Sequence, residues 1–112
     1  MIRCRRLAPS LLLALPTLLS AAPPGVERQQ ELRHLLRHDC GSCHGMTLRG
    51  GLGPSLLPTA LDGKPLDYLS AIILDGRPGS AMPGWRGMLS EADARWLAER
   101  LQSGELAVAD GS

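Results

Sequence analysis

Hydrophobic and polar residues are arranged along this 112-residue chain in patterns that predict helices separated by loops. Residues 7–19 form an apolar run that only prolines and small polar residues interrupt. Beyond it, apolar positions recur with helical spacing in three stretches, 26–39, 65–75 and 91–103. The segments 45–64 and 76–89 are rich in glycine and proline, which indicates loops. β-Branched residues are scarce after residue 22, and this argues against an all-β sandwich or barrel.

The ends of the predicted helices carry residues that begin and end helices. Pro65 suits the first position of the middle helix, and Gly76 ends it. Ser90 is placed to cap the last helix, with Asp93 three residues later in the capping-box position. Gly104 is placed to cap the other end of that helix.

The core that these helices can form is small. Leu32, Leu35 and Leu36 share a face of the first helix, and we expect Trp96 to pack on them. The chain has two tryptophans, one tyrosine and no phenylalanine. Glycine and proline together make up 20 of the 90 residues after position 22. A domain with so small a core needs additional stabilisation, which could come from disulfides, a metal ion or a cofactor.

The first 22 residues have the layout of a secretory signal peptide. Three arginines precede the apolar run, and small residues follow it, so we expect cleavage after Ser20, Ala21 or Ala22. The run is shorter than the ~20 apolar residues of a membrane-spanning helix and contains Pro9 and Pro16. An uncleaved anchor and a twin-arginine signal are the alternatives. The predicted organisation is a signal peptide at 1–22, a domain at 23–104 and a flexible tail at 105–112.

Removal of the signal changes the charge of the chain. The full chain has 12 basic and 11 acidic residues, a formal charge of +1. Three arginines leave with the signal, so nine basic residues remain against 11 acidic ones and the charge becomes −2. No basic cluster remains, and we therefore expect no nucleic-acid partner. We also expect no membrane span in the mature chain, because the apolar run leaves with the signal.

Two cysteines remain after the signal, and they carry the clearest chemistry. Cys40 and Cys43 are separated by two residues and followed at once by His44. A structural zinc site needs four ligands, and only His34 and His38 could join this group. A thioredoxin-like dithiol would need strand and helix context around the pair. The pattern favours a third interpretation, one covalently attached haem c, in which the two thiols add to the haem vinyls and His44 binds the iron.

The opposite face of the iron would need a second axial ligand, and we expect Met82. It lies in a loop 38 residues after His44, and Pro83 stiffens the chain just behind it. The other candidates are Met46, Met88, His34 and His38. Met46 is too close to His44, the two histidines suit solvated helix faces, and Met88 suits a core contact. Ligation by histidine and methionine closes both faces, which favours an electron carrier over an enzyme or a gas sensor with an open iron site.

Other residues could shape the surroundings of the haem. The Pro54 carbonyl could accept the second ring N–H of His44 and so orient it, although Gly53-Pro54 could also be a plain turn. Arg77 could donate to a haem propionate or be a solvated surface residue. Trp85 could donate there too, or pack against the haem edge. Arg49 is a weaker candidate for the same role.

Together these features resemble a class I c-type cytochrome over residues 26–103. The resemblance implies an all-α fold of three or four helices around one haem, with the first and last helices crossing. Many members carry glycine and an aromatic residue in the first helix where Leu32 and Leu36 stand here, so we expect a looser or differently packed crossing.

Residues 39–54, with Gly76-Arg77-Pro78-Gly79, Met82-Pro83 and Trp85, resemble more narrowly the NirC-type small monohaem cytochromes encoded with nitrite reductase. This resemblance implies a periplasmic, monomeric electron carrier rather than an enzyme. Its redox partners would be an upstream donor and a cytochrome cd nitrite reductase of the NirS type. It also implies an alternative role as an electron acceptor in the maturation of haem d-one of that enzyme.

Overall fold

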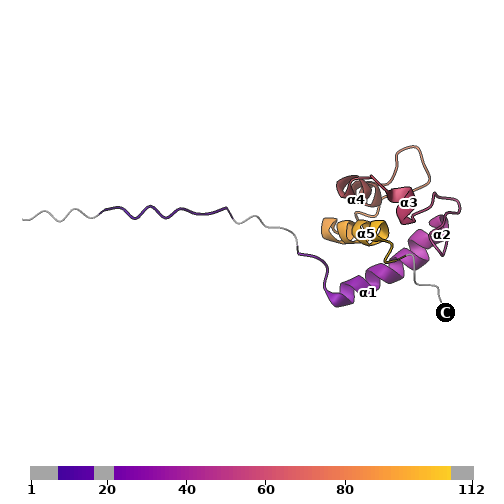
Figure 1. Ribbon diagram of the computed structural model, residues 1–112, viewed down its shortest axis with the longest axis horizontal. Helices are drawn as coiled ribbons and strands as arrows, with labels where there is room; N and C mark the ends of the chain where they lie inside the picture. Colours follow the sequence, from indigo (N-terminus) through magenta and orange to yellow (C-terminus); the bar gives the residue numbers. More distant parts are fainter. Residues whose placement is uncertain (1–7, 17–21, 107–112) are drawn as a thin grey trace, which may run out of the picture.

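The computed structural model describes residues 8–16 and 22–106, and in these it contains helices and no β-strand. The elements in chain order are α1 (Val26–Leu35), the π-helical turn η1 (Leu36–Cys40), α2 (Gly41–His44), α3 (Pro58–Leu61), α4 (Leu66–Asp75) and α5 (Glu91–Ser103). Figure 1 shows α4 and α5 lying together, with α1 below them and α2 at its far end. The all-α fold predicted from the sequence is confirmed.

The first helix does not end before the cysteine motif, as the sequence predicted, but continues through it. α1, η1 and α2 follow one another without a break, and the backbone at both junctions, Leu36 and Gly41, has right-handed helical dihedral angles. The helix ends only at Gly45, where φ is 88°. The motif is therefore held on a helix, which is a more rigid support than a loop.

The middle of the chain differs from the prediction in two details. The segment 45–64 is not entirely loop, because Pro58 begins the one-turn helix α3. α4 begins at Leu66, with Pro65 as its N-cap rather than its first helical residue. Gly76 ends α4 as expected, with φ of 72°.

α5 has the bounds and the caps that the sequence predicted. The Ser90 hydroxyl accepts a hydrogen bond from the Asp93 backbone N–H at 3.0 Å, and the Asp93 carboxylate accepts one from the Ser90 N–H at 3.1 Å. Gly104 ends the helix in the left-handed conformation. The same carboxylate accepts two hydrogen bonds from the guanidinium of Arg28, at 2.8 and 3.2 Å. One carboxylate thus caps α5 and ties it to α1.

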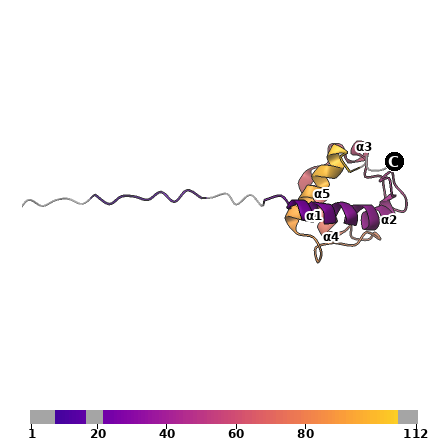
Figure 2. The ribbon, with the colours of Figure 1, turned by 90° about the horizontal axis from the view of Figure 1, so that it is seen from below.

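The hydrophobic core is built around α5, which packs against α4 and is crossed by α1, as Figure 2 shows from below. Leu32 of α1 and Leu97 of α5 are the largest side chains that are almost completely buried. Trp96 is in the same cluster, as expected, and the guanidinium groups of Arg33 and Arg100 each lie about 5 Å from the centre of its ring. Leucines therefore fill the inside of this crossing, and the cation–π contacts of Trp96 lie at its edge.

The end of the domain extends two residues beyond its predicted boundary. Glu105 forms ion pairs with Arg33 and Arg100, and Leu106 is buried against the core. These two residues therefore belong to the folded domain rather than to a tail. The remaining predicted tail, 107–112, lies outside the described residues.

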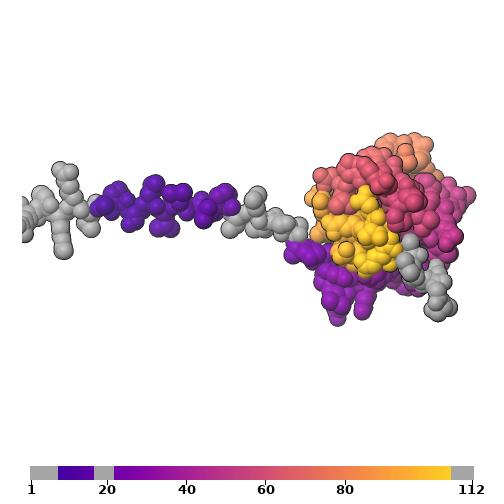
Figure 3. Space-filling view, viewed as in Figure 1, coloured from indigo at the N-terminus to yellow at the C-terminus, as the bar shows by residue number. Residues whose placement is uncertain are grey.

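The segment before α1 is described only in part. Of the predicted signal peptide, residues 1–7 and 17–21 lie outside the described residues, and the leucines of 8–16 are exposed. No helix in the described ranges is both long enough and apolar enough to cross a membrane. Figure 3 shows the surfaces of α1 and α5 side by side on the folded part of the chain.

Candidate functional site

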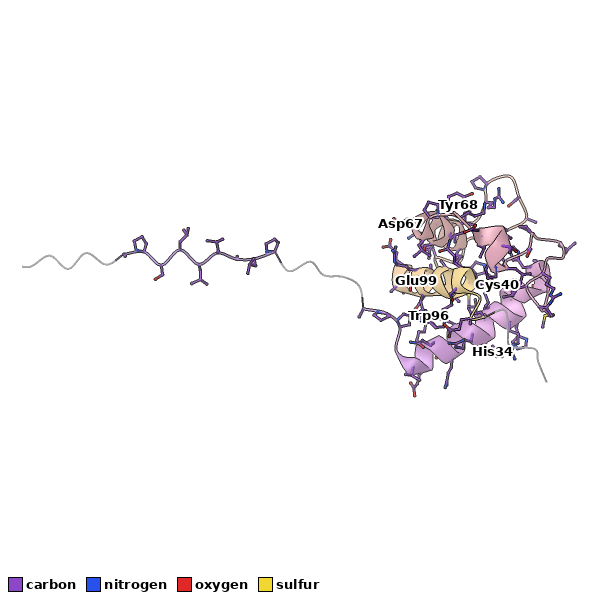
Figure 4. All side chains as sticks on the ribbon, viewed as in Figure 1. His34, Cys40, Asp67, Tyr68, Trp96 and Glu99 are labelled. Atoms are coloured by element: carbon purple, nitrogen blue, oxygen red, sulfur yellow. The ribbon has the colours of Figure 1, made fainter. Side chains whose placement is uncertain are left out.

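The Cys-X-X-Cys-His motif forms the last turns of the first helical stretch. Cys40 is the final residue of η1, and Cys43 and His44 end α2. Cys40 is half-buried, Cys43 is exposed, and neither forms a disulfide. Figure 4 places Cys40 at the end of this stretch that lies farthest from the N-terminal segment. Two free thiols one helical turn apart are thus available to one ligand.

The His44 imidazole is held by the backbone of the following loop. The ring is buried, with 8% of its surface exposed, and Nδ1 donates to the Pro54 carbonyl oxygen at 2.7 Å. The loop is tied to α2 by hydrogen bonds from the Gly53 N–H to the Cys43 carbonyl and from the Gly50 N–H to the His44 carbonyl, both 2.8 Å. Because a carbonyl can only accept, Nδ1 must carry the proton. Nε2 is then the nitrogen that can bind a metal ion.

Glycines let the loop approach the histidine this closely. A Cβ added to Gly53 would lie 2.8 Å from Nδ1 of His44, closer than side chains tolerate. Gly45 has a φ of 88°, and a Cβ there would lie 2.6 Å from the Gly50 carbonyl oxygen. The sequence predicted that the Pro54 carbonyl could orient His44, with a plain turn as the alternative, but it did not indicate that Gly53 and Gly45 fit directly against the imidazole and the helix end.

One buried residue of this loop was missed by the sequence analysis. Leu48 is 3% exposed and belongs to the core, although it lies in a segment predicted as loop. Its φ of 61° is in the left-handed region, which leucine rarely adopts. Its backbone is fixed on both sides, by hydrogen bonds with Gly45 and Leu56. Leu48 therefore anchors the loop that carries Pro54 to the helices.

The environment of Cys40 keeps its thiol protonated. Burial, and then the negative charge of Asp39, raise the pKa of Cys40 to about 11. A thiol in this environment is not activated as a thiolate nucleophile. Among the described residues, no three histidine, cysteine or acidic side chains gather as a metal site. The lack of further ligands among the described residues argues against the zinc interpretation.

Met82 lies in a second loop that is fastened to the end of α4. The Trp85 and Arg86 N–H groups donate to the carbonyls of Ile73 and Leu74, at 3.1 and 3.0 Å. A Cβ added to Gly76 would lie 2.6 Å from the carbonyl oxygen of Met82, so glycine is needed there too. Met82 is half-buried, and its carbonyl accepts a hydrogen bond from the Arg77 N–H at 3.4 Å. It is thus presented by a constrained loop on a different part of the chain from His44.

The other candidates for a second ligand lie at the surface. Met46 is 55% exposed and Met88 is 64% exposed. The expected core contact of Met88 is therefore wrong; its carbonyl accepts a hydrogen bond from Arg28, and its N–H donates to the Trp85 carbonyl. His34 and His38 are exposed on the first helical stretch, as predicted for solvated side chains.

The residues expected to surround a haem differ in how exposed they are and in what they contact. Arg77 and Arg49 are exposed, and neither side chain is hydrogen-bonded to a described residue. Trp85 is half-buried and packs against the core cluster. The structure thus brings His44 and Pro54 into direct contact, but it joins neither of them to Met82, Arg77 or Trp85 by a hydrogen bond within the described ranges.

These residues fit a haem attached through two thioethers. The thiols of Cys40 and Cys43 are unpaired and one turn apart, and His44 follows them with only Nε2 left to bind a metal. A groove of about 710 Å³ lies between α4 and α5, and its walls include Leu74 and Trp96 but no residue of the motif. The motif is therefore the site whose chemistry calls for a cofactor.

Comparisons with known proteins agree with this assignment. The sequence profile of the family described as "Cytochrome C oxidase, cbb3-type, subunit III" matches residues 27–99. Cytochrome c55X of Paracoccus denitrificans is 58% identical over 81 residues, which cover 72% of this chain and 79% of that protein. A solved structure of the c-type cytochrome NirC matches with a TM-score of 0.74 and 58% identity, covering 75% of this chain and 99% of that one.

A larger protein contains a similar stretch. A dihydro-heme d1 dehydrogenase of Pseudomonas aeruginosa is 40% identical over 89 residues, which are 80% of this chain but only 18% of that protein. The profile match spans nearly the whole helical domain, from α1 into α5. On these matches, the chain belongs to the c-type cytochrome family.

Proposed function

We propose that this chain is an exported, periplasmic carrier of single electrons that serves nitrite reduction in denitrification. Its cofactor, as for other c-type cytochromes, is covalently bound haem c, which supplies an iron that alternates between the ferrous and ferric states. The observation that carries the proposal is the turn in which Cys40, Cys43 and His44 lie together, with His44 Nδ1 held by Pro54. Cys40 and Cys43 hold the haem, and His44 is one axial ligand.

Met82 is the other axial ligand in this proposal. The backbone of its loop is constrained by the close approach of Gly76 and by hydrogen bonds to α4, which supports a fixed position for Met82. An iron held by His44 and Met82 would keep both protein ligands on oxidation and reduction, and the small reorganisation would favour rapid electron transfer. It also leaves no iron position for a substrate, so we propose a carrier rather than an enzyme or a gas sensor.

The proposed electron acceptor is a cytochrome cd nitrite reductase of the NirS type. The similarity to a cytochrome c55X from Paracoccus denitrificans supports a place in denitrification. The decisive experiment mixes the reduced mature protein with purified oxidised nitrite reductase in a stopped-flow instrument. Oxidation of this haem with matching reduction of the enzyme, at a rate that keeps pace with nitrite turnover, supports the proposal. Oxidation far slower than turnover would overturn it.

A second function is favoured by one comparison. A protein named as a dihydro-heme d1 dehydrogenase contains a stretch 40% identical to this chain, and a dehydrogenase must pass electrons to an acceptor. This chain could therefore accept electrons while haem d-one is completed. Deletion of the gene separates the two functions. A nitrite reductase that lacks finished haem d-one would indicate maturation, whereas a complete enzyme that turns over slowly would indicate electron delivery.

A further inference from the structure

Two histidines outside the haem site lie together on the surface. His34 is in the last turn of α1 and His38 is in η1, and both are exposed. The centres of their rings are 4.2 Å apart, and the ring planes are inclined by 44°. Figure 4 shows His34 on the side of α1 that faces away from α5. The proposed electron-transfer function uses neither side chain.

The local helix geometry explains why the two rings meet. In an α-helix with 3.6 residues per turn, a side chain four positions on has passed slightly beyond one full turn. Here the helix widens into a π-turn between the two histidines, and a wider turn reduces this overshoot. His38 is therefore brought nearly in line with His34 along the helix.

The separation of the rings matches that of two imidazoles on one metal ion. With metal–nitrogen distances of about 2.0–2.1 Å and a right angle at the metal, the two ring centres would lie about 4.5 Å apart. The observed 4.2 Å is within a few tenths of an ångström of that value. The tilt between the rings also differs from the parallel arrangement of stacked rings. Small rotations of the side chains would thus let both rings bind one ion.

We propose that His34 and His38 form a surface site for a divalent transition-metal ion. Imidazole nitrogens suit Cu²⁺, Ni²⁺ and Zn²⁺, and for such ligands Cu²⁺ binds more tightly than Ni²⁺ or Zn²⁺. No group of three histidine, cysteine or acidic side chains occurs in the described residues, so the protein supplies two ligands here. Water fills the other positions. The site is exposed, and it lies on the helical stretch that carries the haem cysteines.

Titration calorimetry of the haem-loaded mature protein with NiCl₂ and with CuCl₂ tests this site. The expected result is one ion per chain, with Cu²⁺ bound more tightly than Ni²⁺. Because both rings are needed for chelation, H34N and H38N should each weaken binding by about tenfold or more. The matched control is R37Q, which removes a charge between the two histidines but no ligand, and it should not weaken binding.

The double variant H34N/H38N decides the matter. If it binds either ion as tightly as the wild type, or if the wild type binds neither, the proposal is wrong. An unchanged visible spectrum of the haem in each variant shows that the fold and the haem site are intact. Loss of metal binding with an unchanged haem spectrum therefore assigns the ion to the two histidines.

Discussion

At the scale of single residues, the close fit of Gly53 against the His44 imidazole leads to the first prediction. Replacement of Gly53 by alanine would place a Cβ only 2.8 Å from Nδ1 of His44. The loop must then shift, and the hydrogen bond from Nδ1 to the Pro54 carbonyl weakens. That hydrogen bond makes the imidazole a stronger donor to the iron, and its loss should raise the reduction potential. Potentiometric titration of the G53A protein measures the change.

The control for this variant is G63A, because a Cβ at Gly63 meets no atom within 4 Å. Gly63 has a positive φ, which Gly53 does not, so G63A strains the backbone away from His44 and shows whether such strain alone changes the potential. An equal potential in G53A and G63A would mean that the contact of Gly53 with the imidazole does not influence the iron.

The assignment of Met82 as the second ligand leads to another prediction. Met82→Ala should open one face of the iron, allow the ferrous protein to bind carbon monoxide rapidly, and lower the reduction potential. The wild type should bind carbon monoxide slowly. The methionine–iron charge-transfer band in the visible spectrum should disappear in M82A and persist in the control M88A, because Met88 is 64% exposed. A band that survives in M82A and disappears in M88A would reverse the assignment.

At the scale of elements, one carboxylate joins two helices and predicts a pH dependence of stability. Burial works to raise the pKa of Asp93, but hydrogen bonds from Arg28 and Ser90 outweigh it and hold the pKa below the ordinary value of 3.8. Because the pKa of Asp93 is lower in the folded state than in the unfolded chain, its charged carboxylate stabilises the fold at pH values above the unfolded-state pKa. This stabilisation is lost as the pH falls through the lowered pKa.

We therefore expect D93A to destabilise the haem-loaded protein by about 2–3 kcal/mol at pH 7, from the lost cap and the lost partner of Arg28. Guanidinium unfolding at pH 7 and at a pH below 3 measures the difference, which should shrink at the lower pH. The control is E91Q, in the same turn of α5 but with a side chain that is 84% exposed. A loss of stability that is the same at both pH values would contradict the role of the charge.

The helices also show how much of the fold the sequence could predict. α5 was predictable at both ends because Ser90, Asp93 and Gly104 act through local backbone geometry. The continuation of α1 through the cysteines was not predictable, because the glycine and serine within the motif have weak helix propensity. That stretch is kept helical by the packing of the buried Leu36. The same reasoning applies to the site. The contact of His44 with Pro54 follows from a local turn, whereas the burial of Leu48 depends on tertiary packing.

At the scale of the whole molecule, charge predicts how the carrier meets its partners. After position 22 the chain has nine basic and 11 acidic residues, a formal charge of −2. Many of its charges are already paired at the surface, as in the pairs Arg86–Asp75 and Arg95–Asp67. Long-range steering should therefore be weak, and the rate of electron transfer should change little with ionic strength. Stopped-flow measurements from low to high salt test this, and a steep dependence would indicate a charged docking surface.

The size of the core gives the last prediction, which concerns the chain without haem. The buried hydrophobic residues of the described chain number 13, and only two large side chains among them, Leu32 and Leu97, are less than 2% exposed. A core of this size barely offsets the conformational entropy lost when some 80 residues become ordered, at roughly 1–2 kcal/mol for each backbone. The variant C40A/C43A, which cannot attach haem, should therefore be largely unfolded. Far-ultraviolet circular dichroism and a cooperative thermal transition are the measurements. A variant that keeps the helical signal and melts cooperatively would show that the protein core alone holds this fold.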